Sequence, residues 1–266
     1  MKSPSWVAII SIVLVGSVAA YFYWEDSQPQ SAPVGLQAPP PPLPPPKTVV
    51  RQVIEAPPTT PALPALANSD SFMLDALSGL VDDKSLMKLF NAEKIIHNIV
   101  ATIINLNDSR APMSVMPVKP APGTFGTERI GGGLIISPKN ATRYAPYVRI
   151  AEVINSKKLV ELYIRVYPLF QRAYEQLGYP NKYFNDLLIQ TLDNLLDTPT
   201  IKEPVKLVQP NVLYLFADPD LEEQSSGRKI LMRTGSRNEA IIKSKLREIR
   251  QELLLHTHEK NMDGAG

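Results

Sequence analysis

The chain has 266 residues, of which 28 are Lys or Arg and 26 are Asp or Glu, so its formal net charge at pH 7 is only +2. So small a charge produces no overall field that would favour nucleic acid as a partner. Cysteine is absent, which excludes disulfides, thiolate catalysis and cysteine-ligated zinc or iron–sulfur sites. Hydrophobic residues at 44% and charged residues at 20% exclude a fully disordered chain and a polytopic membrane protein.

An uncharged, apolar stretch runs from Trp6 to Trp24. At the helical rise of about 1.5 Å per residue, a helix of this length just crosses a hydrocarbon core of about 30 Å. Aromatic residues lie at both ends of the stretch, as at membrane interfaces, and Lys2 precedes it. We therefore expect a single transmembrane helix here, with residues 1–5 in the cytoplasm. A cleaved signal peptide is the alternative, because residues 17–19 resemble a small-residue cleavage site.

Thirteen of the 26 prolines lie between Pro29 and Pro64. Such a segment favours extended polyproline II structure over a packed core. Residues 25–69 are therefore predicted to form a disordered stalk that holds the following domain away from the bilayer. The segment also contains a PxxPx(K/R) match to ligands of SH3-like grooves, although proline-rich spacers produce such matches by composition alone.

Residues 70–255 are long enough to bury one sizeable core. Apolar residues recur at three- and four-residue spacing over residues 86–104, which predicts a helical start. Over residues 111–140, prolines and glycines interrupt this pattern and favour a long loop or a small hairpin. In such a hairpin, residues 125–130 would pair with residues 134–136 across three glycines.

The clearest helical pattern lies in SKKLVELYIRVYPLFQRAYEQLGYP. Its apolar residues fall on one face, Ser156 can cap its start, and Gly178 closes its end. A second helix follows from a cap at Asn181, and the turn between the two helices is short. We expect these helices to form an antiparallel hairpin.

The end of the domain is predicted to hold short helices and then a long one. Asp218-Pro219 is typical of a helix start, and residues 225–227 of a helix stop. The Ser-x-x-Glu sequence at residues 236–239 matches the capping box of a final helix. The expected fold is an all-α domain over residues 70–255, with a Gly/Pro-rich loop or hairpin insertion and a disordered tail over residues 256–266.

Six sequence blocks in the second half of the chain resemble one known family. In chain order they read RYAPYVRI, YPLFQRAYEQLGYP, YFNDLLIQTLDNLLDTP, LVQPNVLYLFADPDLEE, GRKILMRTGSRNEA and KSKLREIRQEL. These blocks, from Arg143 to Leu253, closely resemble an uncharacterised bacterial envelope family catalogued as domain of unknown function 3014. The anchor and stalk are also similar to members of that family, whereas residues 107–140 match loosely. The resemblance implies a single-pass anchor, a Pro-rich stalk and a helical domain, and it implies no mechanism because the family has no assigned activity.

Two groups of residues are candidates for binding. Tyrosines and arginines concentrate in residues 143–214, a composition typical of surfaces that are partly apolar and partly wet. The residues predicted to line a groove are Arg143, Tyr144, Tyr167, Tyr174 and Tyr179. Arg233, Gly235 and Ser236 form a candidate anion site, because free backbone N–H groups and guanidinium groups lie together at a helix start. The simpler alternatives are tyrosines that pack along their helix and an ordinary basic helix face.

The densest carboxylates are those of Asp218, Asp220, Glu222 and Glu223. Paired acids can supply the general acid and base of glycan cleavage, although acids at a helix start are equally explained by the helix dipole. The chain carries no Gly-x-Ser-x-Gly sequence and no phosphate-binding loop. We therefore assign no catalytic residue, and we expect no metal site and no cofactor.

The sequence predicts a single-pass protein of the bacterial inner membrane whose C-terminal domain lies in the periplasm. Its expected partners are the lipid bilayer, through residues 6–24, and another envelope protein, through the domain; nucleic acid is not expected. The expected function is that of an interaction or scaffold module without defined catalytic activity. The alternative is a domain that binds or hydrolyses cell-wall glycan, with peptidoglycan as ligand and the acids of residues 218–223 as its working groups.

Overall fold

The computed structural model describes residue 54, residues 62–81 and residues 83–263, with side chains as far as residue 256. All of these belong to one of two units into which the chain divides, Val50–Gly266. The predicted transmembrane helix and most of the predicted stalk lie outside the described residues. Among the helices that the structure does describe, none is both long enough and apolar enough to cross a membrane.

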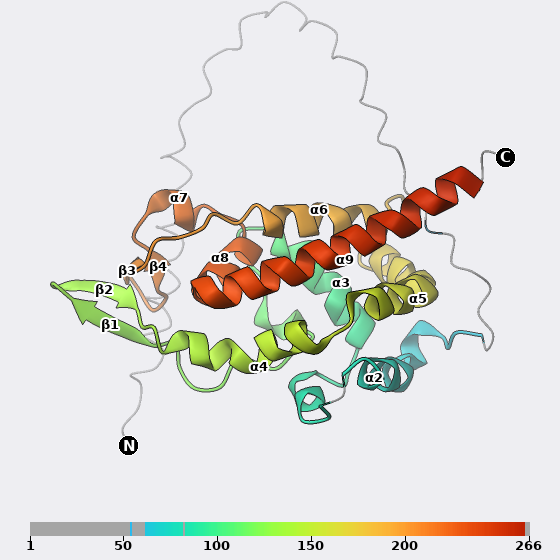
Figure 1. The fold of residues 1–266 in the computed structure, drawn as a ribbon, viewed down its shortest axis with the longest axis horizontal. Helices are drawn as coiled ribbons and strands as arrows, with labels where there is room; N and C mark the ends of the chain where they lie inside the picture. Colours follow the sequence, from blue (N-terminus) through green and yellow to red (C-terminus); the bar gives the residue numbers. More distant parts are fainter. Residues whose placement is uncertain (1–53, 55–61, 82, 264–266) are drawn as a thin grey trace, which may run out of the picture. The chain divides into compact units, whose positions relative to one another are not determined.

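Helices dominate the described part of the chain (Figure 1). The α-helices are α2 (Asp70–Ser78), α3 (Ile95–Leu106), α4 (Asn140–Val153), α5 (Ser156–Gln176), α6 (Phe184–Leu196), α7 (Pro219–Glu222), α8 (Ser226–Arg233) and α9 (Ser236–Asp263). Three short 3₁₀ helices join them, namely η1 (Leu66–Asn68), η2 (Leu86–Leu89) and η3 (Met113–Val115).

A small antiparallel sheet accompanies the helices, with the strand order β1-β2-β3-β4. Its strands are β1 (Thr127–Ile130), β2 (Gly133–Ile136), β3 (Lys206–Val208) and β4 (Leu215–Phe216). The predicted helical domain with a hairpin insertion is confirmed in part: the fold is mostly helical, but the hairpin belongs to a four-stranded sheet, so the domain is not all-α. Strands β3 and β4 are too short to display an alternating pattern, and only the pairing of β3 with β2 and of β4 with β3 defines them.

The main core is formed by α2, α3, α5 and α6, and aromatic rings fill its centre. The stripe predicted on α5 is confirmed by the burial of Val166, Phe170 and Ala173. The rings of Phe170 and Phe184 stack with centroids 5.5 Å apart, and Phe184 is completely buried. Gly178 ends α5 with a φ of 102°, which glycine adopts without strain.

Helices α5 and α6 form the predicted antiparallel hairpin. Late in α5, Gln171 accepts a hydrogen bond from the Phe184 backbone N–H (2.9 Å), whereas early in α5, Val160 packs with Leu192 near the end of α6. Helix α9 crosses the pair and buries Leu253 against Val160 and Leu192. As Figure 1 shows, α9 also runs over α4, and α4 follows directly from the β1–β2 hairpin.

Several predicted caps are wrong because a neighbouring residue takes the position. Asn155, not Ser156, caps α5 by accepting from the Lys158 N–H at 3.0 Å. Tyr183 precedes α6 in place of Asn181, without a side-chain cap. The predicted stop at residues 225–227 is instead the start of α8, where Ser225 is the N-cap.

The capping box predicted at residues 236–239 does not form. Helix α9 begins at Ser236, and the Glu239 N–H donates to the Gly235 carbonyl at 2.9 Å. The Glu239 side chain is buried and faces Lys243, with 3.5 Å between Oε1 and Nζ. The Glu239 side chain therefore pairs with Lys243, one turn further along the helix, and does not serve as the partner in a capping box.

The folded unit includes residues that the sequence assigned to the stalk. Leu63 and Leu66 pack against the main core, and Ile54 is itself buried in it. Ser69 is 1% exposed, and its hydroxyl donates to the Leu66 carbonyl at 2.8 Å. Packing therefore begins before residue 70.

Candidate binding surfaces

The structure buries two of the predicted groove tyrosines. Tyr167 and Tyr174 lie in the main core, and Tyr174 stacks on the half-buried Tyr179 with centroids 4.6 Å apart. Burial raises the pKa of Tyr167 to about 12, and its hydroxyl donates to Gln171. Tyr167 and Tyr174 thus cannot line an exposed groove. Their hydroxyls are polar, but the rings bury enough apolar area to belong inside.

The predicted residues of α4 and of the turn between α8 and α9 come together where these elements meet, whereas Tyr179 packs against the main core. A Cβ added at Gly235 would lie 3.4 Å from the Ala141 Cβ, and Asn238 donates to the Ala141 carbonyl at 2.9 Å. Arg143 and the half-buried Tyr144 follow Ala141 in α4, with the guanidinium 5.4 Å from the ring centroid. The sequence analysis placed Arg143 and Tyr144 in the groove and Gly235 in the separate anion site, and it did not predict that the two groups meet.

The Arg143 side chain donates hydrogen bonds to the loop that precedes the β1–β2 hairpin. Its Nε donates to the Pro122 carbonyl at 2.9 Å, and its NH2 donates to the Gly123 carbonyl at 3.1 Å. A guanidinium with five donors can hold several carbonyls at once, and here it fastens a backbone segment. Arg143 therefore serves the local structure.

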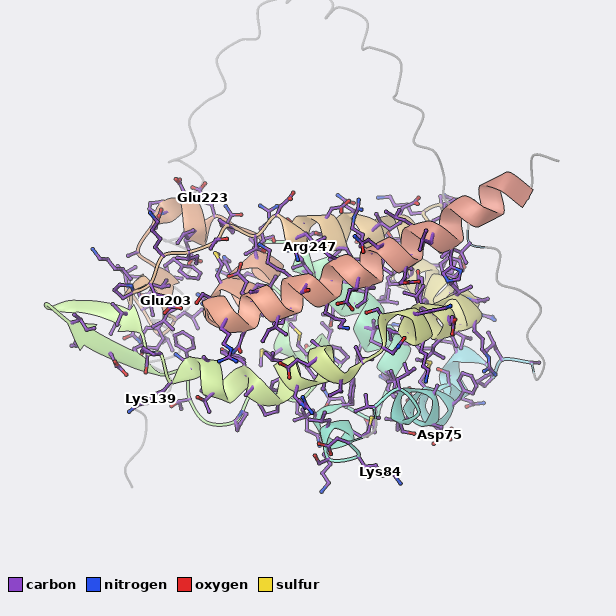
Figure 2. All side chains as sticks on the ribbon, in the orientation of Figure 1. Asp75, Lys84, Lys139, Glu203, Glu223 and Arg247 are labelled. Atoms are coloured by element: carbon purple, nitrogen blue, oxygen red, sulfur yellow. The ribbon has the colours of Figure 1, made fainter. Side chains whose placement is uncertain are left out.

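The predicted anion position at the start of α9 is occupied by a carboxylate of the chain. Ser236 Oγ donates to Glu203 Oε1 at 3.0 Å, and the Ser236 N–H lies 3.4 Å from the same atom. Figure 2 shows Glu203 near this end of α9. The Arg233 side chain is used within the domain. Its NH2 donates to the Tyr214 carbonyl at 3.0 Å, and its guanidinium lies 4.9 Å from the Phe216 ring centroid. Burial lowers its pKa.

The acids at and around α7 also hold structure together. Asp218 caps α7 by accepting from the Asp220 N–H at 3.0 Å. Glu222 accepts from the Phe216 N–H at 2.8 Å and pairs with Lys229 at 3.0 Å. These bonds join α7 to β4 and α8. In the residues that the structure describes, no three His, Asp or Glu side chains are grouped as metal ligands.

One end of the sheet exposes aliphatic side chains, a feature that the sequence analysis missed. We call Ile130, Val208, Val212 and Leu213 the sheet patch; their exposed fractions are 59%, 45%, 87% and 68%. Ile130 pairs with Gly133, and the β2–β3 register continued by one residue sets Gly133 opposite Val208. Paired residues point to the same face, so Ile130 and Val208 lie in one row across a glycine.

Val212 and Leu213 lie in the turn between β3 and β4, directly after this row. Gln209 Nε2 donates to the Val212 carbonyl at 3.3 Å and ties the turn together. The exposed cation Lys206, two residues before Val208 on β3, lies on the same face of the sheet as the patch, and among the described residues its side chain has no ion pair. An aliphatic pair directly after Pro210-Asn211 is the sequence signal that could have indicated an exposed turn.

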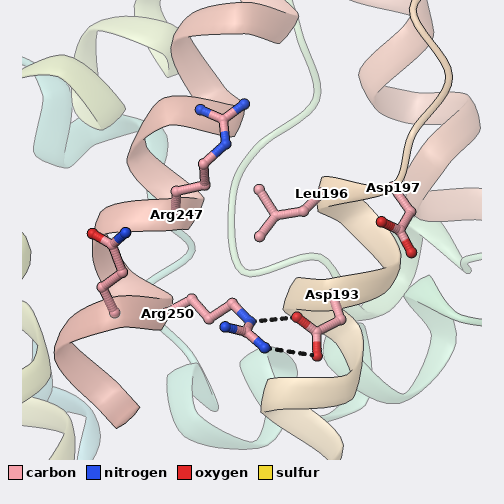
Figure 3. A pocket seen from close by; sticks show the side chains of 6 residues that line it. Asp193, Leu196, Asp197, Arg247 and Arg250 are labelled. Atoms are coloured by element: carbon pink, nitrogen blue, oxygen red, sulfur yellow. Dashed lines mark hydrogen bonds and ion pairs between the residues drawn. The ribbon is translucent and has the colours of Figure 1, made fainter. Parts of the chain in front are cut away.

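A second feature is an open cleft between α6 and α9, with a volume of about 520 Å³ (Figure 3). We call it the α6–α9 cleft; it is lined by Asp193, Leu196, Asp197, Arg247, Arg250 and Gln251. Arg250 donates two hydrogen bonds to Asp193, from Nε to Oδ1 and from NH2 to Oδ2 at 3.3 Å. This bidentate pair bridges the two helices and raises the pKa of Arg250.

The described residues thus define a mostly helical domain with a small antiparallel sheet and two surface features. The family model described as Protein of unknown function (DUF3014) matches residues 95–250, more than half of the chain, so the chain belongs to this family. The resemblance found in the sequence blocks is thereby confirmed. The match begins at the first residue of α3 and contains the sheet patch and every lining residue of the α6–α9 cleft except Gln251. Curated proteins and solved structures give no match.

Proposed function

We propose that the chain is a membrane-anchored interaction module of the bacterial cell envelope, without catalytic activity of its own. Residues 6–24 anchor it in the inner membrane, and the proline-rich stalk presents the domain in the periplasm. The support for the anchor and stalk is the uncharged apolar run and the concentration of prolines in the sequence. A spacer of this kind is useful when a binding surface must reach a partner at a distance from the bilayer.

The sheet patch is the observation that carries the proposal. Soluble domains bury large aliphatic side chains, and a local group of exposed ones, rimmed by polar residues, marks an interaction surface. Val212 and Leu213 are the most exposed members, and they lie in a turn that no other element of the described chain covers from the solvent. Burial of apolar area here would supply about 25 cal/mol per Å² removed from water.

Charge on the rim indicates what kind of partner fits. Lys206 is exposed on the same face of the sheet as Ile130 and Val208, the two patch residues on the strands. A complementary partner therefore presents apolar side chains flanked by Asp or Glu. The occupant we propose is such an acidic and apolar segment of another envelope protein.

The test is crosslinked capture of partners from cells by the full-length tagged chain. The variant carrying Val212→Glu and Leu213→Glu places two negative charges in the patch, and we expect it to lose the captured protein. Leu255→Glu is the matched control, because Leu255 is an exposed aliphatic residue (57%) on α9, and it should capture normally. Lys206→Glu should weaken capture by removing the complementary charge.

Two results would contradict the proposal. Equal capture by the patch variant and the Leu255→Glu control would show that the patch is not the contact. Recovery of peptidoglycan fragments alone, with no protein dependent on the patch, would instead support the glycan-binding alternative. Circular dichroism of each purified variant should match that of the wild type, because all four substituted side chains are exposed.

A further inference from the structure

The α6–α9 cleft contains two exposed charged groups: Arg247, which has no ion pair among the described residues, and Asp197, whose ion pair with Arg228 is long, at 3.8 Å. Arg250 and Asp193 neutralise each other within the cleft. Asp197 lies at the end of α6 on one wall, and Arg247 lies on α9 on the other. Figure 3 shows Leu196 between these two side chains. The cleft therefore has an acidic wall, a basic wall and an apolar residue between them.

Asp197 is placed where a cation is favoured. It is the C-cap residue of α6, so its carboxylate adds negative charge at the negative end of the helix dipole. Its nearest cation in the described chain is Arg228, whose NH2 is 3.8 Å from Asp197 Oδ2. Arg228 also donates to the Asn194 carbonyl at 2.7 Å and to Gln224 at 2.9 Å. The Asp197 side chain is 78% exposed and open to a ligand.

Arg247 supplies the opposite charge. Its side chain is exposed, and within residues 62–81 and 83–256 it makes no ion pair and no side-chain hydrogen bond. Figure 2 shows it on the surface of α9 that faces α6. An unpaired guanidinium beside a cleft is suited to bind a carboxylate in bidentate fashion.

We infer that the α6–α9 cleft binds a short peptide with free ends, its carboxylate at Arg247 and its amino group at Asp197. A ligand with both charges satisfies both walls, whereas a simple anion or cation satisfies only one. The volume of about 520 Å³ lies within the usual range for small-ligand sites, and small apolar side chains of the peptide would contact Leu196. This inference concerns a different surface from the sheet patch and does not depend on the proposed function.

Trialanine is the probe, because it has both charged ends and small side chains. Its affinity for the full-length chain in detergent is measured by saturation-transfer NMR and compared with those of N-acetyl-trialanine and trialanine amide. Each analogue lacks one charge, and we expect each to bind about tenfold more weakly than trialanine, as a lost hydrogen bond to a charged group predicts.

Two substitutions assign the ends of the peptide. Arg247→Gln should weaken trialanine about tenfold but leave trialanine amide unchanged, because that analogue has no carboxylate to lose. Asp197→Asn should weaken trialanine but not N-acetyl-trialanine. Arg237→Gln and Asp75→Asn are the matched controls, since both side chains are exposed and lie outside the cleft, and both variants should bind trialanine as the wild type does.

The inference is overturned if trialanine does not bind at millimolar concentration, or if trialanine and its amide bind equally. It is also overturned if Arg247→Gln weakens both ligands to the same extent. The variant carrying Val212→Glu and Leu213→Glu should bind trialanine normally. Loss of partner capture in that variant with normal trialanine binding therefore separates the two surfaces.

Discussion

Large apolar side chains are buried in the helical core but exposed at the end of the sheet. Tyr163, Phe170 and Phe184 pack ring against ring in the core, with centroids 5.5 to 6.4 Å apart. At the sheet end, Ile130 and Val212 face solvent. The aromatic residues that suggested a binding surface in the sequence are thus largely structural, and aliphatic residues form the exposed surface.

The reason for this contrast is the number of layers available to each region. Helices α3, α5 and α6 surround the core on several sides. In the sheet, Leu207 and Phe216 pack against α8. The β1–β2 end of the sheet extends beyond these contacts (Figure 1). A short sheet at the edge of a helical domain therefore carries apolar side chains that the domain itself does not cover.

The largest predicted loss of stability is for a substitution at the centre of the core. Phe184→Ala should destabilise the chain by about 3–5 kcal/mol, because it removes a completely buried ring from a stack and leaves a cavity. Val212→Ala, in the sheet patch, should change the stability by less than about 0.5 kcal/mol. Urea unfolding of the full-length chain in detergent, followed by circular dichroism, measures both. A similar loss in the two variants would mean that the patch is buried after all.

A second prediction concerns the close packing of α8 against α3 and α6 at Gly227. A Cβ at Gly227 would lie 2.6 Å from Leu195 Cδ2 and 3.0 Å from the Leu106 carbonyl, so Gly227→Ala should cost about 1–3 kcal/mol. Gly79→Ala is the control, because its Cβ would meet nothing closer than 3.5 Å. The same urea unfolding assay should leave this control near the wild type. Equal stability of both variants would show that α8 is not held closely by α3 and α6.

The smallest predicted effects are two opposite dependences on pH. Burial raises the pKa of Glu239, so its contribution to stability falls as pH rises through that pKa. Hydrogen bonds from Lys245 and Ser156 lower the pKa of Glu248, so its contribution is lost as pH falls through that pKa.

These slopes are measured by chemical unfolding between about pH 3 and pH 7. Relative to the wild type, Glu239→Gln should gain stability as the pH rises, whereas Glu248→Gln should lose it. Slopes of the same sign for both variants would contradict the burial of Glu239.

The parts of the fold that were predictable depend on local patterns. The amphipathic stripe of α5 and the positive φ of Gly178 follow from residues near one another in the chain. Gly227 shows the limit, since Ser225, Ser226 and Gly227 are typical of a helix stop but begin a helix. That helix needs a glycine because Leu195 and Leu106 approach it, and only tertiary packing places them there.

The binding surfaces were less predictable for the same reason. Ser236 looked free to bind an anion, but Glu203, distant in sequence, occupies the position. The exposed state of Val212 depends on how β3 pairs with the hairpin and β4 pairs with β3. Likewise, Arg247 and Asp197 face one cleft only because α9 crosses α6.

The most direct test of the central claim is photo-crosslinking in living cells at single positions of the full-length chain. A photoreactive amino acid replaces Val212 in one strain and Leu255 in another, because both side chains are exposed and aliphatic. If the sheet patch binds an envelope protein, position 212 should give one discrete adduct containing that protein, and position 255 should not. The absence of an adduct at position 212, or the same adduct from both positions, would contradict the account.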